Sequence, residues 1–226
     1  TLAKLDEVAP TDAVDEVTVA AMHERLGLSI ELAEAGEPLR NLNNIASTSQ
    51  DIRDLFDLLP TETDQDWANI SARLGDVKRA LGGHVESLRL AASRGQVAAA
   101  RQVRAVAGQA HNQAGESSSF LTLVSSPETQ ALPESLRKEL AANAASAQAA
   151  YGDFANFLET ELLPQAGEQD GVGRERYQLF SREFLGATID LDETYEWGRE
   201  RLATIDAEQR EVARELYGEG VSVQEA

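Results

Sequence analysis

The fold is decided by residues 63–88, which read TDQDWANISARLGDVKRALGGHVESL. Thr63 and Asp66 have the spacing of a capping box, in which two side chains bond the free backbone N–H groups at a helix start. Behind them the buried-type positions advance by alternating steps of three and four residues: Trp67, Ile70, Leu74, Val77, Leu81, His84 and Leu88. This period places one stripe on a single helix face, against a neighbouring helix. Because glycine weakens a helix, we expect a break or bend near one of three positions: Gly75, Gly82 and Gly83.

Helix starts of the same kind recur on both sides of this stretch. Thr11 or Asp12 can cap a helix that ends near Gly36, and Ser47 with Gln50 repeats the capping-box spacing. Asp190 and Glu193 have similar spacing ahead of the last helix. We expect further helices over 96–114 and from Pro133 up to Pro164, and a loop over 115–127 whose apolar residues turn inward. His84, which lies on the first stripe, is expected to be an interior, hydrogen-bonded residue.

Helical patterns therefore account for nearly the whole chain, and no run of alternating strand residues competes with them. The prediction is an all-α protein, an irregular multi-helix bundle of about seven to eight helices with short loops. At 226 residues we expect a single helical domain over 1–226, the amino-terminal part of a larger protein, with 1–125 and 126–226 as candidate sub-units.

The charge balance and the absence of cysteine exclude several classes of function. The net charge of −19 repels phosphate backbones and anionic lipids, so we expect no nucleic-acid and no membrane partner. Without cysteine there is no disulfide or thiolate chemistry. No apolar run reaches the roughly 20 residues of a membrane-spanning helix. We expect a cytoplasmic protein, or a secreted or lipid-anchored one if a leader was removed before Thr1.

The aromatic residues are concentrated in residues 167–197, GEQDGVGRERYQLFSREFLGATIDLDETYEW. Arg174, Arg176 and Tyr177 follow a glycine turn at a helix start, where an Arg fork and free N–H groups favour a carboxylate. The same arginines can instead pair with nearby acidic residues. Tyr195 lies on the apolar stripe of the last helix, and we expect it to be part of the core.

Three motifs that resemble catalytic sites have simpler interpretations. His23 and Glu24 begin like a zinc-binding helix, but no second histidine follows one turn later. The spacing of Asp190 and Asp192 matches an aspartyl phosphatase loop, yet it opens a periodic helix, where an N-cap is the better interpretation. The two glycines at 171 and 173 lack the remaining residues of a phosphate-binding loop. We therefore predict no catalytic residue and no cofactor in this chain.

Several segments resemble the amino-terminal half of the bacterial domain of unknown function family 885. The resemblance covers 41–88, 95–96, 101–103 and 151–164, and it is closest in GVGRERY (171–177) and FLGATIDLDETYEWG (184–198). The family is similar to all-helical zinc metallopeptidases of the gluzincin type. The resemblance implies a zinc-bound water that attacks a peptide carbonyl, with a glutamate as general base, in the carboxyl-terminal half of a longer protein.

The resemblance supplies no metal ligand within this chain, and its segments that match best suggest a lining for a substrate cleft: Arg174, Tyr177 and Tyr195. The expected function is the helical wall of a peptide-binding cleft in a metallopeptidase-like hydrolase, catalytically incomplete alone. Its partners would be a missing carboxyl-terminal half or another protein chain, and a peptide ligand. Zinc would belong to the longer parent protein. The alternative is a free-standing helical module that binds or scaffolds partner proteins.

Overall fold

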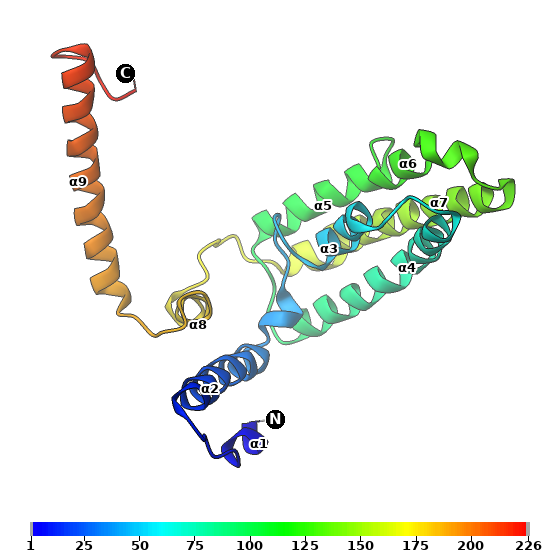
Figure 1. Ribbon diagram of the computed structural model, residues 1–226. Coiled ribbons are helices and arrows are strands. Elements are labelled where there is room, and N and C mark those ends of the chain that lie inside the picture. Colours follow the sequence, from blue (N-terminus) through cyan, green and yellow to red (C-terminus); the bar gives the residue numbers. More distant parts are fainter. Residues whose placement is uncertain (1, 225–226) are drawn as a thin grey trace. The chain divides into compact units, whose positions relative to one another are not determined.

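A computed structural model describes residues 2–224 (Figure 1). Within this range the chain is helical and has no strand, so the all-α prediction is confirmed. The chain forms two compact units: unit 2 comprises residues 30–171, and unit 1 comprises the residues up to Ser29 and from Val172 onward. The division does not fall after residue 125, because the helices on both sides of that position pack into one core.

Unit 2 contains most of the helices and the turns between them. Its helices are α3 (Thr48–Asp54), α4 (Asp64–Ser93), α5 (Ala100–Ala114), α6 (Ser119–Val124) and α7 (Glu134–Phe157). Short 3-10 segments lie at η1 (Glu37–Arg40), η2 (Leu55–Leu58), η3 (Pro127–Ala131) and η5 (Leu163–Gln165). The end of α7 continues as one π-helical turn, η4 (Leu158–Leu162).

The core of unit 2 lies along α7, which packs against α4 and α5 (Figure 1). Asn143 of α7 donates to the hydroxyl of Ser71 in α4, and Arg89 of α4 donates to Glu161 in η4. Since both pairs are separated by the same number of residues, α4 and α7 run parallel. The contacts of α5 with α7 run in the opposite sense, so α5 is antiparallel to α7.

α4 is unbroken from Asp64 to Ser93, so the predicted break at its glycines is wrong. Every residue of the predicted stripe is buried, and this continuous packing outweighs the weak helix preference of glycine. Gly82 and Gly83 have open space around the position of a Cβ atom, and at Gly75 an added Cβ would make an ordinary contact with Asn143.

The segment 115–127 is also more ordered than predicted, because α6 occupies its centre. Phe120 is fully buried, with its ring at 5.4 Å and 5.5 Å from the rings of Phe56 and Tyr151. The prediction that its apolar residues turn inward is therefore confirmed. The prediction that the whole segment is a loop is wrong. α5 likewise begins at Ala100 and not at Gln96.

The predicted caps are confirmed. Ser47 with Gln50, and Thr63 with Asp66, form complete capping boxes at the starts of α3 and α4. Asp12 accepts hydrogen bonds from the backbone N–H groups of Val14 and Asp15.

Unit 1 is formed by both ends of the described chain. It contains α1 (Leu2–Asp6), most of α2 (Ala13–Glu34), α8 (Arg174–Leu185) and α9 (Leu191–Tyr217). Unlike unit 2 it has few buried side chains; on α8 none is buried, and on α9 only Ala213 is, among the described residues.

Candidate functional site

The junction of α8 and α9 contains the residues singled out from the sequence. Gly173, with a φ of 83°, turns the chain into α8, so Arg174 is the first residue of that helix. Its Nη2 lies 2.5 Å from Oδ1 of Asp192, in the first turn of α9. This ion pair holds the starts of the two helices together, and it raises the pKa of the Arg174 guanidinium. Of the two partners expected for Arg174, the structure therefore gives it the local acidic residue.

Asp190 is the N-cap of α9. Its Oδ1 accepts hydrogen bonds from the backbone N–H groups of Asp192 and Glu193, at 2.9 and 3.0 Å. These two bonds, from Glu193 and then Asp192, lower the pKa of the Asp190 carboxyl group. A carboxylate whose oxygen already caps a helix is not placed as a phosphatase nucleophile, so the capping interpretation is confirmed.

Tyr195 is not a core residue, and that prediction is wrong. Its side chain is 68% exposed, because no helix among the described residues packs against that face of α9. Tyr177, one turn into α8, is also exposed. Tyr195 lies one turn after Asp192, so the ion pair brings the helix ends carrying Arg174 and Tyr195 together. Within residues 2–224 no hydrogen bond joins Arg174, Tyr177 and Tyr195 to one another.

Four rings on the two helices of this junction are exposed, and we call them together the aromatic surface: Tyr177, Phe184, Tyr195 and Trp197. Phe184 is 88% exposed and Trp197 is 64% exposed. Arg176 lies over the ring of Phe180 on the same helix, with 5.8 Å between its Cζ atom and the ring centroid. Exposed apolar side chains of this size are candidates for contact with another molecule.

Two contacts that the sequence did not predict attach α8 to α2. Arg182 makes a two-pronged ion pair with Glu24, with N–O distances of 2.6 and 2.7 Å. Nη1 of Arg25 donates to the backbone carbonyl of Glu183 at 2.6 Å. The hydrogen bond from Arg182 lowers the pKa of the Glu24 carboxyl group. The partners are separated by 158 residues, so no local spacing could have indicated these pairs.

The histidines do not fit a metal site. His23 pairs with Asp6 at 3.3 Å, and His111 pairs with Glu159 at 2.9 Å. His84 is buried beside the ring of Phe154, and its Nε2 has no hydrogen-bond partner in the described part of the chain. It is interior as predicted, but this nitrogen lacks the expected hydrogen bond. No group of three or more His, Cys, Asp or Glu side chains in residues 2–224 comes together as a metal site would require.

In unit 2 the polar side chains serve the packing of the core. The hydroxyl group of Tyr151 donates to the backbone carbonyl of Ser49 at 2.6 Å, and burial raises the pKa of this phenol. Gln109 bonds both Gln50 and the carbonyl of Asn44, which fixes the segment before α3 against α5. These groups have their partners within the fold, so the candidate site remains the α8–α9 junction.

The comparison with protein families accounts for the whole chain. The family described as "Bacterial protein of unknown function (DUF885)" matches residues 1–226. The chain belongs to this family. A search of curated proteins found no match to the chain. None of the helices described in residues 2–224 is both long and apolar enough to cross a membrane.

Proposed function

We propose that this chain is the helical part of a zinc metallopeptidase-like protein, in which it forms one wall of a peptide-binding cleft and is catalytically incomplete by itself. The proposal starts from the membership of the chain in this family. The peptidase character comes from the resemblance of the family to gluzincin-type enzymes. The observation that carries the binding role is the aromatic surface at the α8–α9 junction.

The chemistry of that surface suits an extended polypeptide. Rings such as Trp197 and Phe184 offer a large apolar contact area at a small cost in side-chain entropy. The phenols of Tyr177 and Tyr195 can donate to and accept from peptide backbone groups. Arg174, beside the free N–H groups of the first turn of α8, provides positive charge for an acidic side chain or a terminal carboxylate.

Arg174 would have to exchange partners to take part. Its present partner, Asp192, is exposed, and exposed ion pairs contribute only about 0–1 kcal/mol. A ligand carboxylate could therefore replace Asp192 at little cost. In this proposal Arg174 orients the ligand and the aromatic rings supply most of the binding free energy.

Zinc is assigned to a part of the protein outside this chain. When bound, the metal would supply the activated water of a metallopeptidase. The described histidines and carboxylates do not fit such a site, so no step of the reaction is derived from this chain. We expect the purified chain to retain no stoichiometric zinc after dialysis and to cleave no peptide. One equivalent of tightly bound zinc, measured by elemental analysis, would overturn this assignment.

The binding role can be tested with the chain itself. Trp197 is exposed whereas Trp67 is buried, so an unstructured acidic peptide that binds the aromatic surface should shift only the Trp197 emission. The shift should vanish in Trp197→Phe. We expect the double variant Tyr177→Ala with Tyr195→Ala to bind about tenfold more weakly or worse, since each lost ring contributes about 1 kcal/mol.

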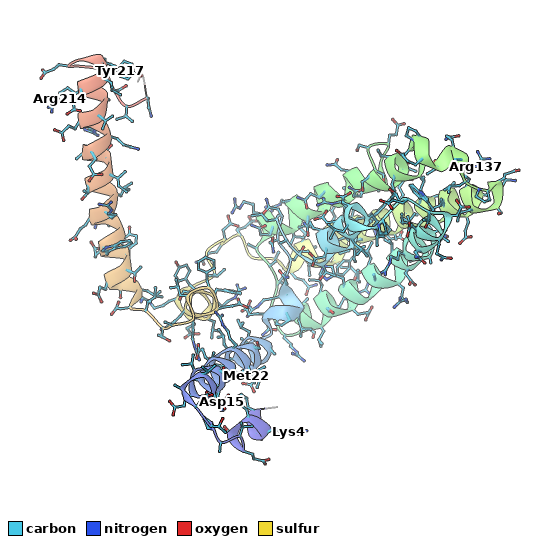
Figure 2. The ribbon with its side chains drawn as sticks, in the orientation of Figure 1. Lys4, Asp15, Met22, Arg137, Arg214 and Tyr217 are labelled. Atoms are coloured by element: carbon cyan, nitrogen blue, oxygen red, sulfur yellow. The ribbon has the colours of Figure 1, made fainter. Side chains whose placement is uncertain are left out.

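Tyr217→Ala is the matched control, because Tyr217 is a similarly exposed tyrosine at the other end of α9 (Figure 2). It should bind like the unmodified chain. Equal binding by the control and by the double variant would contradict the proposal. If peptides leave the emission of Trp197 unchanged while a folded protein shifts it, the alternative of a free-standing binding module replaces the cleft.

A further inference from the structure

The apolar face of α9 continues well beyond the aromatic surface. It occupies every third or fourth residue of the helix, and we call the following set the α9 stripe: Leu191, Tyr195, Gly198, Leu202, Ile205, Gln209, Val212 and Leu216. A helix normally buries such a face against a neighbour. Here Leu202 is 67% exposed and Leu216 is 69% exposed, and the buried Ala213 lies off the stripe.

The spacing of the α9 stripe is that of a coiled-coil seam. Its steps alternate between three and four residues over the length of the helix, which is about 40 Å. A seam of this period fits another helix lying alongside it. The charged residues that flank the seam then decide which helix fits.

Those flanking charges have opposite signs in the two halves of α9. Arg199 and Arg201 border the first half of the stripe, and Asp206 and Glu208 border the second half. Arg199 now lies 3.3 Å from Glu196, and Asp206 lies 2.9 Å from Arg210, all within the helix. Exposed pairs of this kind are weak, so Arg199 and Asp206 can exchange their present partners for those of another helix.

We propose that α9 is a self-association helix, through which two copies of this chain pair antiparallel along the α9 stripe. In this pairing Leu202 faces Ile205 of the partner subunit, and Tyr195 faces Val212 of the partner subunit. The two-fold symmetry repeats each contact. The interface shares Tyr195 with the aromatic surface, but it does not involve Arg174 or Tyr177, and the tests below change neither of them.

Charge complementarity favours the second copy as the occupant. The antiparallel register that aligns the apolar residues also brings Arg199 next to Asp206 of the partner subunit. It brings Arg201 next to Glu208 of the partner subunit. Symmetry makes both attractive pairs twice, and no like charges meet across the centre of the seam.

The two residues of the stripe that are not apolar favour the antiparallel direction. It places the small Gly198 opposite the longer Gln209 of the partner subunit, so their volumes complement each other. Parallel pairing would place Gly198 opposite Gly198 of the partner subunit, which leaves a void. It would also place the two Gln209 side chains together in the seam. Voids and unmatched polar groups in a seam are destabilising.

The first test is the mass of the full chain in solution. Sedimentation should show a reversible monomer–dimer equilibrium across about 1–300 µM protein, the range of weak association. Leu202→Asp should raise the dissociation constant at least about tenfold, because it places a charge at the centre of the seam. Leu58→Asp is the matched control, since Leu58 is 82% exposed in unit 2. It should dimerise like the unmodified chain.

The second test exchanges charges without removing apolar contacts. Arg199→Glu with Arg201→Glu should be monomeric, and so should Asp206→Arg with Glu208→Arg. A mixture of the two double variants should restore the dimer, since every flanking pair is then attractive. This result also holds if Leu202→Asp fails to fold, which circular dichroism would reveal.

The third test fixes the direction, and it is clean because the chain has no cysteine of its own. Under mild oxidation, a mixture of Gly198→Cys and Gln209→Cys should form a disulfide between the two variants. Gly198→Cys alone should link only if the helices are parallel. A chain that stays monomeric throughout the concentration range would overturn the proposal, as would a dimer that Leu202→Asp leaves intact or one that Gly198→Cys alone cross-links.

Discussion

His84 is the titratable group whose environment differs most between the folded and unfolded chain. It is buried on α4 against Phe154, and burial lowers its pKa from 6.5 to about 4. The unfolded chain therefore binds a proton between these two values that the folded chain does not. The free energy of unfolding should fall as the pH drops from about 6.5 towards 4. At neutral pH the imidazole is neutral in both states, so none of this stability is lost there.

The loss should be about 2 kcal/mol between pH 7 and pH 5, since one pKa unit corresponds to about 1.4 kcal/mol. Urea titrations at the two pH values would measure it. In His84→Leu the part of the pH dependence that belongs to this group should disappear, whereas His111→Leu, at an exposed ion pair, should behave like the unmodified chain. If His84→Leu retains the full pH dependence, the buried imidazole is not its source.

The same residue illustrates what the sequence could and could not predict at this scale. A histidine on a seven-member apolar stripe was correctly placed in the core. The missing bond at Nε2 depends on which groups of α7 and α3 approach it, and no spacing within α4 contains that information. The prediction that Tyr195 is a core residue was wrong for the converse reason. Its stripe is as regular as that of α4, but no partner among the described residues covers it.

At the scale of elements, local signals predicted the helix starts well. The capping boxes at Ser47 and Thr63 and the cap at Asp190 depend on contacts over three residues, which the sequence shows directly. Predicting where helices would break was less successful. Glycine preference is a property of a single residue, whereas the continuity of α4 is maintained by its packing against α7 along its length.

Gly82 therefore lowers the stability of α4, although nothing in the structure requires a glycine at this position. It is exposed in the middle of α4, and nothing lies within 4 Å of an added Cβ atom. Gly82→Ala should stabilise the chain by about 0.5–1 kcal/mol, mainly by restricting the unfolded state. Gly95→Ala is the control: it also has open space, but its φ of +70° disfavours alanine, so it should be destabilising. Thermal unfolding of both variants would measure the difference, and a Gly82→Ala variant that unfolds earlier would show that α4 requires flexibility there.

At the scale of the whole molecule, the two units differ in how their helices are stabilised. The buried apolar cluster belongs to unit 2, from Leu42 to Leu162. Unit 1 is held instead by a few polar contacts, chiefly those of Arg182 and Arg25 with α2 and α8. Sequence periodicity could not reveal this contrast, because α9 and α4 carry stripes of the same kind.

This contrast predicts how the chain is digested. A protease of broad specificity first cuts segments that open at little cost in free energy. These are segments that are not helical, are exposed to solvent and do not pack against the core. Such segments lie at 7–12, between α1 and α2, and at 167–173, before α8. Brief digestion at low protein concentration should leave a resistant fragment that begins near α2 and ends near η5, identifiable by mass spectrometry. α8 and α9 should be lost from it, since their side chains are almost all exposed.

A high protein concentration should protect α9 selectively if it pairs with a second copy, and the Leu202→Asp variant should lose that protection. Early cuts within α4 or α7 would contradict the assignment of the stable core to unit 2.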